Sequence, residues 1–345
     1  MKALVRRSYE AGDVELMDIP EPHPGPGQVK IKVEYAGICG SDIKSIDRPL
    51  PPGGKVRPPI VLGHEGVGIV VELGPGVTNV KVGDRVSAET TLVQCGLCRY
   101  CRSGRINMCL NREGLGSRAN GYFAEYVIAR AAVCHIIPDH ISPKAAAVLE
   151  PLACAVNAVM QRSSTQAGDV AVVYGPGTIG QCVAQVAKAC GAYVVMVGTP
   201  RSRERLKVAA KLGIDRILVT GEDDVVKEVM ELTEGYGADI VYEAVGSESA
   251  FVEALKCVRK LGKFVIAASP ATPVSFDIRW FFSREITMIG AISTDNESWD
   301  ISMNLLKKGI VDLGSLVTSV VPLSEWRTGF AKGKEREGIK ILIAP

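Results

Sequence analysis

The fold of this chain is decided by the stretch Val170-Ala171-Val172-Val173-Tyr174-Gly175-Pro176-Gly177-Thr178-Ile179-Gly180. Its apolar first half, rich in β-branched residues, predicts a buried strand. The glycines that follow have the spacing G-x-G-x-x-G, and a helical pattern begins at Thr178. That spacing alone is weak, and a glycine-rich turn without a ligand is the alternative. Directly between a strand and a helix, however, it predicts a turn that binds a dinucleotide pyrophosphate. The expected contacts are Gly175, Gly177, Thr178, Ile179 and Gly180.

From about Ala167 onward the sequence alternates between strand and helix patterns. Apolar runs predict buried parallel strands at Tyr193–Val197, Arg216–Val219, Asp239–Val245 and Lys263–Ala267. Between them, amphipathic patterns predict helices at Thr178–Cys190, Ser202–Leu212, Asp223–Leu232 and Glu248–Arg259. Strand–helix repetition of this kind predicts an α/β fold, a doubly wound Rossmann sheet that binds a nucleotide.

The first half of the chain has a different texture. Short β-branched runs at Lys30–Tyr35, Ile69–Leu73 and Arg85–Ala88 are separated by glycine and proline, which predicts a β-rich domain. The 345 residues are enough for two domains with separate cores. With 47% hydrophobic and 23% charged residues, the composition is ordinary for a globular protein.

Charge and hydropathy exclude several classes of partner. The net charge is only +2, from 40 basic and 38 acidic side chains, so neither a nucleic acid nor a membrane surface is indicated. No run of about eighteen apolar residues occurs, so we expect no transmembrane helix. The N-terminus lacks an apolar run of signal-peptide length. Ten cysteines in such a chain fit a reducing compartment, and we expect a cytoplasmic protein.

The end of the second predicted strand bears on the choice of cofactor. An NAD-binding unit usually has Asp or Glu there, which accepts hydrogen bonds from the adenosine ribose. This chain has Val197-Gly198-Thr199-Pro200-Arg201-Ser202-Arg203 instead, with Gly198 at the acidic position. Without the carboxylate, Thr199, Arg201 and Arg203 are free to bind a 2′-phosphate, which favours NADP over NAD. The alternative is a solvated helix start that accepts either cofactor.

A cluster of four cysteines, Cys95-x2-Cys98-x2-Cys101-x7-Cys109, predicts a tetrahedral zinc site. Disulfides or free thiols are one alternative. An iron–sulfur cluster is another, but the bacterial ferredoxin run has its fourth cysteine sooner and a proline after it. Here Leu110 follows Cys109. Because four thiolates leave zinc no open position, we expect this site to be structural.

A second candidate metal site involves His64, which lies in Gly63-His64-Glu65-Gly66. A histidine followed by an acid invites metal coordination, although a lone histidine is more often structural. Two further segments add donors: Gly37-Ile38-Cys39-Gly40-Ser41-Asp42 and Leu149-Glu150-Pro151.

With these motifs the sequence resembles the zinc-containing medium-chain alcohol and polyol dehydrogenases. It looks most like the branch of sorbitol, xylitol, butanediol and threonine dehydrogenases. The resemblance covers essentially the whole chain, including Val82–Val86, Phe123–Tyr126 and Gly338–Lys340. It implies a discontinuous GroES-like, β-rich catalytic domain, residues 1–153 and 286–345, and a Rossmann NAD(P)-binding domain, residues 154–285. The changes in sequence texture near residues 153 and 286 agree with this division.

The resemblance also implies the residues of the site. Cys39, His64 and Glu65 are expected to bind a catalytic zinc, and Glu150 to approach it directly or through water. Ser41 is expected to begin a proton relay to solvent. Many relatives have histidine three residues after that serine, but this chain has Lys44, which either ends the relay or has no role.

The implied function is zinc-dependent hydride transfer between a secondary alcohol or polyol and NAD(P), with two zinc ions per chain. Oxidation of L-threonine is the runner-up, and a non-catalytic zinc-ribbon interaction protein is the alternative from another class. A small-molecule substrate and a homodimer or homotetramer are expected. The segment Gly290–Thr294 lacks the arginine that some polyol dehydrogenases carry nearby, so a sugar phosphate is not indicated.

Overall fold

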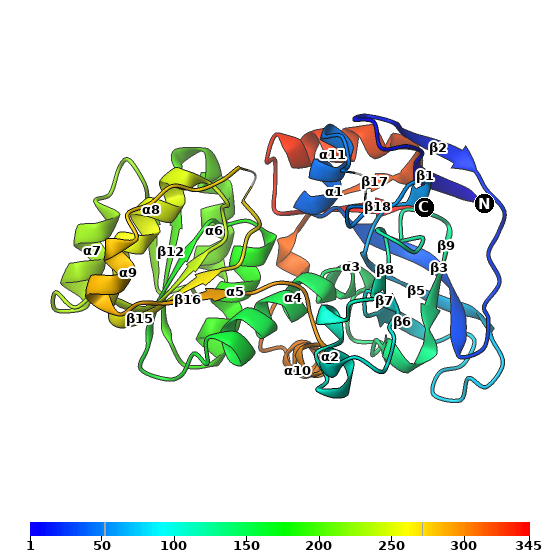
Figure 1. Ribbon diagram of the computed structural model, residues 1–345, viewed down its shortest axis with the longest axis horizontal. Coiled ribbons are helices and arrows are strands. Elements are labelled where there is room, and N and C mark those ends of the chain that lie inside the picture. The colour runs from blue at the N-terminus through cyan, green and yellow to red at the C-terminus, as the bar shows by residue number, and fades with distance from the viewer. Residues whose placement is uncertain (52, 271) are drawn as a thin grey trace. The chain divides into compact units, whose positions relative to one another are not determined.

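The computed structural model describes residues 1–51, 53–270 and 272–345, which form two compact units (Figure 1). The β-rich unit comprises Met1–Glu150, Thr294–Lys307 and Leu313–Pro345, and the parallel-sheet unit comprises Pro151–Ser293 and Lys308–Asp312. The domain boundaries expected at 153 and 286 remain a prediction. The parallel-sheet unit continues to Ser293 because residues 287–290 form its last strand.

The parallel-sheet unit alternates strands with helices, as expected. Its elements are β11 Val170–Tyr174, α5 Thr178–Ala189, β12 Tyr193–Gly198, α6 Arg203–Lys211, β13 Arg216–Val219, α7 Val225–Leu232, β14 Ala238–Glu243, α8 Glu248–Cys257, β15 Val258–Ile266, α9 Arg279–Arg284 and β16 Thr287–Gly290. The strands are parallel in the order β13-β12-β11-β14-β15-β16. Numbered within the unit this order is 3-2-1-4-5-6, which confirms the predicted Rossmann sheet.

The predicted elements of this unit are present, most of them with shifted ends. The strand predicted at Asp239–Val245 ends at Glu243, and the one predicted at Lys263–Ala267 begins at Val258. The helix predicted to reach Arg259 therefore ends at Cys257. Its helical pattern continues through these residues, but Val258 pairs with Ala238 of the neighbouring strand, and sheet pairing overrides the local pattern.

The β-rich unit is built mainly from antiparallel strands, although β17 and β18 pair in parallel. Its strands are β1 Lys2–Arg6, β2 Val14–Asp18, β3 Gln28–Gly37, β4 Ile60–Val61, β5 Glu65–Leu73, β6 Arg85–Ala88, β7 Thr91–Val93, β8 Glu113–Gly114, β9 Tyr126–Arg130, β10 Cys134–Ile136, β17 Val317–Pro322 and β18 Lys340–Ala344. The largest sheet has the order β10-β6-β5-β3-β18-β17, with β9 paired to β3. The strand β18 at the C-terminus thus lies beside β3, and this pairing closes the unit from both ends of the chain.

The helices of the β-rich unit are few and short. They are α1 Gly40–Asp47, α2 Arg99–Arg102, α3 Pro143–Ala146, α10 Asn296–Lys307 and α11 Trp326–Lys334, while α4 Leu149–Val156 crosses the unit boundary. Short 3-10 turns and one π-helical segment complete the chain: η1 Ile106–Met108, η2 Ala131–Val133, η3 Asn157–Arg162, η4 Pro200–Ser202, η5 Gly314–Leu316 and η6 Leu323–Glu325.

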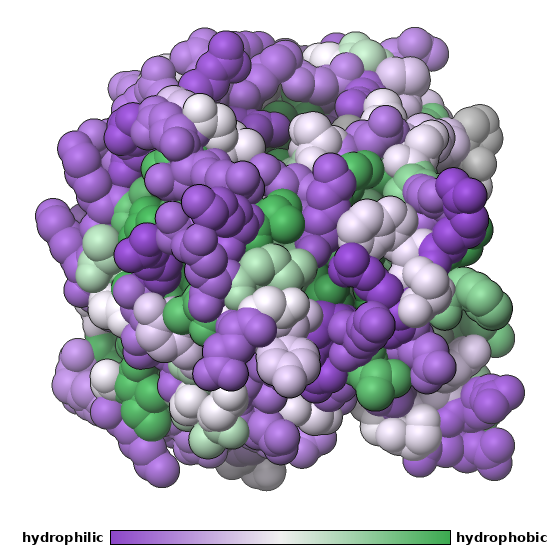
Figure 2. All heavy atoms as spheres, turned by 90° about the vertical axis from the view of Figure 1, so that its left-hand side faces the viewer, coloured by the Kyte–Doolittle hydropathy of each residue, from purple (hydrophilic) through white to green (hydrophobic). Residues whose placement is uncertain are grey.

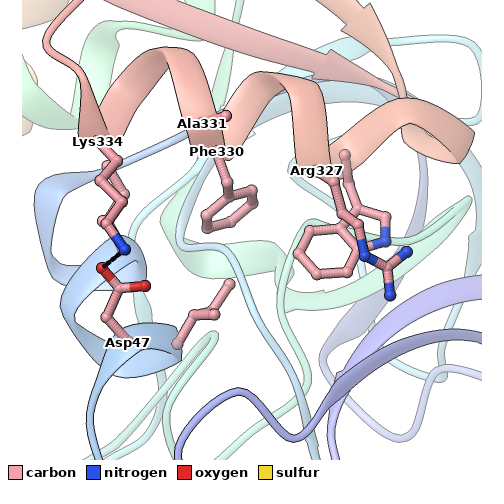
Figure 3. A pocket seen from close by; sticks show the side chains of 8 residues that line it. Asp47, Arg327, Phe330, Ala331 and Lys334 are labelled. Carbon is pink, nitrogen blue, oxygen red and sulfur yellow. Dashed lines mark ion pairs between the residues drawn. The ribbon is translucent and has the colours of Figure 1, made fainter.

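Helix α1 begins directly after β3 and packs against α11, which fixes its position. Figure 3 shows this contact: Phe330 of α11 points toward α1, and Lys334 forms an ion pair with Asp47, 2.9 Å long. The rings of Trp326 and Phe330 meet edge to face, 5.7 Å apart. The second half of α1 is therefore held against a packed aromatic cluster.

None of the helices described here combines the length and apolar character needed to cross a membrane. Figure 2 shows the face of the molecule on the side of α7 and α8, where most side chains are hydrophilic and apolar ones occur in small groups. This face has the character of one that contacts water.

Candidate metal and nucleotide sites

Three predicted ligands come together where β3 ends and β5 begins. These strands are antiparallel neighbours, and Gly37 pairs with Glu65. Cys39 follows β3 and caps α1, while His64 directly precedes β5. One donor atom from each of Cys39, His64 and Glu65 lies within 4.8 Å of the other two. A thiol, an imidazole and a carboxylate at this spacing fit the donor set of a zinc site with an open position.

Two glycines make this arrangement possible. A Cβ on Gly37 would lie 2.2 Å from the Glu65 Oε2 atom, so a side chain there would displace the carboxylate. Gly63 has φ +91°, and a Cβ on it would lie 2.9 Å from the ring of Phe123. The backbone conformation and the space both require glycine just before His64.

Asp42 orients both the cysteine and the histidine. It is the third residue of α1, and its Oδ2 atom accepts a hydrogen bond of 3.0 Å from the Cys39 backbone N–H. Its Oδ1 atom lies 3.5 Å from His64 Nδ1. Burial disfavours the charged imidazolium, but the Asp42 carboxylate and Cys39 outweigh it and hold the pKa of His64 well above its usual range. Because Asp42 faces Nδ1, it leaves Nε2 as the nitrogen for a metal.

Lys340 holds the carboxylate of Glu65 from the other side. Its Nζ atom donates to Glu65 Oε2 at 2.5 Å and to the Ile38 carbonyl oxygen at 3.1 Å. The side chains of Lys340 and Glu65 are 2% and 1% exposed. Burial disfavours the ammonium, but Glu65, Cys39 and Glu150 raise the pKa of Lys340. A buried ion pair of this kind fixes the rotamer of Glu65.

The other residues predicted for this site lie outside the group of Cys39, His64 and Glu65. Glu150 is buried in the first turn of α4 and acts electrostatically on Lys340, but it does not belong to the three-residue group. Ser41 is exposed in the first turn of α1, and Lys44, three residues later, is partly buried.

The four clustered cysteines also converge. The sulfur atoms of Cys95, Cys98, Cys101 and Cys109 all lie within 4.8 Å of one another. Cys95 Sγ is 3.9 Å from Cys101 Sγ and 3.6 Å from Cys109 Sγ. Four sulfurs at 2.3 Å from one zinc would be separated by about 3.8 Å. All ten cysteines are free thiols, so no disulfide competes for these atoms.

Backbone N–H groups favour the thiolate forms of two cysteines in this lobe, and thiolates are the forms that bind a cation. A hydrogen bond from the Cys101 amide helps to lower the pKa of Cys98 to about 6. A hydrogen bond from the Cys95 amide likewise helps to lower the pKa of Cys109. Desolvation and the neighbouring thiols raise the pKa of Cys101 to about 12. A bound cation would stabilise the thiolate form of Cys101 and so oppose this rise.

In the parallel-sheet unit, the glycine-rich turn has the predicted strand–turn–helix context. Gly175 follows β11 with φ +101°, and a Cβ on Gly180 would lie 1.8 Å from the Gly175 carbonyl oxygen. Gly177 caps α5 without a side-chain hydrogen bond, and nothing lies within 4 Å of where its Cβ would be. The turn at Gly175 to Gly180 therefore leaves an open cradle at the N-terminus of α5, beside Thr178 and Ile179.

The end of β12 explains the glycine that replaces the usual acid. A Cβ on Gly198 would lie 2.5 Å from Ser202 Oγ, which accepts a hydrogen bond from the Thr199 N–H. Arg201 is exposed, whereas Arg203 forms an ion pair with Glu222. Arg203 is exposed as well, so the difference between the two predicted arginines is that a neighbouring carboxylate neutralises Arg203.

Glu243 stands at the crevice where ligands of doubly wound sheets bind. It ends β14 opposite Tyr174 of β11. Its Oε1 atom accepts hydrogen bonds of 2.8 Å from the N–H groups of Val245 and Gly246, and burial raises its pKa.

Sequence reasoning assigned no role to four of these residues: Asp42, Lys340, Glu222 and Glu243. A signal was present for the first two, because Asp42 lies in the segment around Cys39 and Lys340 closes the Gly338-Ile339-Lys340 motif. Neither motif shows which side chain Asp42 or Lys340 contacts, because the fold alone brings these partners together.

The two halves of the chain match two family models. Residues 25–139 match the alcohol dehydrogenase GroES-like domain, and residues 178–308 match the zinc-binding dehydrogenase domain. This chain is therefore a dehydrogenase with a GroES-like and a Rossmann domain, as expected. It belongs to the family of zinc-containing medium-chain alcohol and polyol dehydrogenases.

Relatives agree over the full length. The chain is 42% identical over 346 residues to a sorbitol dehydrogenase of Halalkalibacterium halodurans, covering 100% of this chain and 99% of that protein. It is 41% identical over 346 residues to a D-arabitol-phosphate dehydrogenase of Enterococcus avium, covering 99% and 97%. It is also 36% identical over 320 residues to an L-threonine 3-dehydrogenase of Pyrococcus furiosus, covering 92% and 90%.

A solved structure agrees in fold. The 2R,3R-butanediol dehydrogenase of Bacillus subtilis is 33% identical with a TM-score of 0.86, and the match covers 100% of this chain and 99% of that one.

Proposed function

We propose that the chain oxidises a secondary alcohol or polyol at a zinc ion held by Cys39, His64 and Glu65. The observation that carries this proposal is the convergence of these three donors within 4.8 Å. Three protein ligands leave a position for substrate, as a catalytic zinc requires. Glu150 is buried near Lys340, and we place it as the residue that approaches the metal directly or through water.

The residues around the donors have separate tasks. When bound, zinc supplies a Lewis acid that lowers the pKa of the substrate hydroxyl, and the nicotinamide supplies the hydride acceptor. Asp42 keeps the tautomer and orientation of His64, and Lys340 keeps the carboxylate of Glu65 in place. Ser41, exposed at the start of α1, receives the hydroxyl proton and passes it to solvent. Lys44 offers an end to this relay in place of the histidine of relatives.

We place a second zinc in the four-cysteine lobe, where it is structural. The sulfur separations of 3.6 and 3.9 Å match a tetrahedral tetrathiolate site, which is closed to substrate. Metal analysis tests both sites: two zinc ions per chain support the proposal, and one or none contradicts it.

We infer a preference for NADP over NAD. The preference rests on the absence of an acid at Gly198 and on the exposed Arg201 beside Thr199. Arg203 contributes only where the phosphate competes with Glu222 for it. Measuring kcat/KM for both cofactors tests this inference, and a clear preference for NAD would end it.

For the substrate we favour a polyol, because the relatives named for sorbitol and D-arabitol phosphate match over 346 residues at 42% and 41% identity. The match to an L-threonine dehydrogenase makes threonine the second candidate. A panel of polyols, simple secondary alcohols and L-threonine with both cofactors separates them. Turnover of L-threonine alone would favour the second candidate, and turnover of none would overturn both.

We infer a homo-oligomer formed through the edge of the parallel sheet, and a cytoplasmic location. The edge strand β16 pairs only with β15 among the described strands, and Met288 on it is 39% exposed. Such an edge is suited to pairing with a second copy. Ten free thiols fit a reducing compartment. Light scattering of the holoenzyme tests the oligomer.

A further inference from the structure

We infer that the β-rich unit carries a further small-molecule site, a groove between α1 and α11 that binds a small aromatic carboxylate. Figure 3 shows this groove, with the ring of Phe330 pointing into it and with Lys334 and Arg327 on either side of that ring. Its volume is about 130 Å³, close to the roughly 150 Å³ of a cavity that holds one benzene molecule. None of the proposed zinc donors or nucleotide contacts lines it, so the site is separate from those of the proposed function.

The walls of the groove are apolar. Ile43 and Ile46 of α1 are half-buried, and Trp326 and Phe330 of α11 are 6% and 7% exposed. The two helices meet closely where α11 has a glycine, because a Cβ on Gly333 would lie 2.8 Å from Ile43 Cδ1. A ligand beside this contact is surrounded by aliphatic and aromatic side chains, which favours a ligand with an apolar ring.

Trp326 brings an unpaired polar group to this apolar lining. Its Nε1 atom is buried and has no hydrogen-bond partner in the described parts of the chain. Trp299 differs, because its Nε1–H donates to Thr294 Oγ1 at 3.0 Å. A buried indole N–H usually has an acceptor, and an oxygen atom of a ligand in the groove would provide one for Trp326.

The charges around the groove favour an anion. Arg327 Cζ lies 4.4 Å from the centre of the Trp326 ring, and within the described structure this guanidinium has no ion pair with a carboxylate. Lys334 is instead paired with Asp47 at 2.9 Å. With two cations and one carboxylate, the lining has a net charge of +1, which suits a monoanion.

A carboxylate matches these donors in geometry as well as in charge. A guanidinium such as that of Arg327 can donate two parallel hydrogen bonds to a carboxylate, and the indole beneath it has one further N–H. The apolar part of the ligand then packs against Ile43, Ile46 and Phe330. Benzoate is the simplest molecule that combines a ring with a carboxylate, and it is the probe for this site.

Calorimetric titration of the holoenzyme with benzoate tests the site. We expect one benzoate to bind per chain, more tightly than acetate, which lacks the ring, and than benzylammonium, which has the opposite charge. Arg327→Gln should weaken binding of benzoate by about tenfold or more. Ala331→Leu, which enlarges an exposed side chain of the lining, should abolish binding and leave circular dichroism and alcohol turnover unchanged. Arg336→Gln is the matched control, because this exposed arginine does not line the groove, and its affinity for benzoate should be unchanged.

A second measurement reports on the groove itself. The chain has three tryptophans, so labelling them with ¹⁵N gives few indole N–H signals, and Trp326→Phe assigns the relevant one. Benzoate should shift the Trp326 signal, whereas the signal of Trp299, which already has an acceptor, should stay in place.

A carboxylate can also bind a zinc ion that has an open position, so the same titration is made with His64→Ala. This variant lacks one proposed zinc ligand and should still bind benzoate. Loss of binding in His64→Ala, or binding that survives both Arg327→Gln and Ala331→Leu, would overturn the inference. A Trp326 signal that does not move at saturating benzoate, or the absence of saturable binding, would also overturn it. Because binding is measured directly, failure of the alcohol assays would contradict the proposed function and leave this inference standing.

Discussion

Among its described residues, the β-rich unit contains two clusters of side chains that could hold a metal ion, and they differ in chemistry and in setting. The four-cysteine lobe takes all its donors from one stretch of fifteen residues, Cys95 to Cys109. The other cluster, Cys39, His64 and Glu65, draws on two strand ends and is held by Asp42 and Lys340. The lobe can be closed by its own sequence, whereas the second cluster depends on the whole unit. The four-cysteine lobe helps to identify the family, whereas the cluster of Cys39, His64 and Glu65 is the one suited to the reaction.

The largest effect is expected for His64→Ala. Loss of one of three ligands should remove the catalytic zinc and lower kcat by at least about a thousandfold. Circular dichroism should be unchanged, and zinc content should fall from two ions per chain to one. Cys39→Ala is the companion variant with the same expected result. A variant that keeps both zinc ions and most of its activity would contradict the division between the sites.

Cys98→Ser should have the opposite signature. It opens the four-thiolate lobe, so the main loss should be in stability, with Tm lower by about 5 °C or more and less soluble protein. Residual activity per folded chain should stay close to that of the unmodified enzyme. Thermal scans and active-site titration with cofactor measure the two quantities separately. A fully stable but inactive Cys98→Ser enzyme would show that the lobe has been misassigned.

Asp42→Asn tests whether the contact of Asp42 with His64 strengthens zinc binding by Cys39, His64 and Glu65. The amide cannot stabilise the imidazole through Nδ1 as the carboxylate does, so zinc affinity at this site should fall by about tenfold to a hundredfold. Competition with a chelator measures it. Lobe zinc should be unaffected in the same sample. Asp18→Asn, which removes an exposed carboxylate at the end of β2, is the control and should leave zinc affinity unchanged.

Local motifs were the part of both sites that could be predicted. The four cysteines lie within one stretch and the glycine-rich turn is contiguous, so spacing alone predicts their convergence. The partners of the open site could not be predicted in this way. Lys340 and Glu65 are 275 residues apart, and only the pairing of β18 with β3 brings them together. The ion pair of Arg203 with Glu222 likewise depends on how the turn after β13 meets the start of α6.

The fold itself was predictable because the strands of the parallel sheet are continuous apolar runs. Val170–Tyr174 and Arg216–Val219 have the predicted ends. In the β-rich unit the start of β5 was missed: its first residues, Glu65 to Gly68, carry an acid and two glycines, which do not read as a strand. They form one because Gly37 and Ala36 of β3 pair with them. Near a site, pairing with the neighbouring strand can therefore decide where a strand begins, even where the local sequence does not predict it.

Acidification should weaken zinc binding to the lobe in two stages. The His64→Ala variant, which keeps only lobe zinc, isolates this effect. With a pKa of about 12, Cys101 is protonated without metal, so affinity should fall at least about tenfold per pH unit from pH 9 to 6. Cys98, with a pKa of about 6, is already a thiolate in that range, and below pH 6 its protonation should steepen the fall. Chelator competition from pH 9 to 5 measures the slope. An affinity independent of pH between 7 and 8 would contradict the first stage.

The smallest effect is expected outside both metal sites, at Glu222 in the parallel-sheet unit. Its ion pair with Arg203 is about half exposed on both sides, so the pair is weak, but it neutralises one of the two arginines predicted to bind the 2′-phosphate. Glu222→Gln should release Arg203 and raise the ratio of kcat/KM for NADP over NAD by up to about fivefold. Both zinc ions should remain, and the affinity for the polyol should not change. Arg203→Gln should lower the ratio, and it separates release of the arginine from a general change in the turn. Glu222→Gln could leave the ratio unchanged while Arg201→Gln reduced it. In that case Arg201 alone would bind the 2′-phosphate, and one exposed side chain of the parallel-sheet unit would determine the cofactor preference.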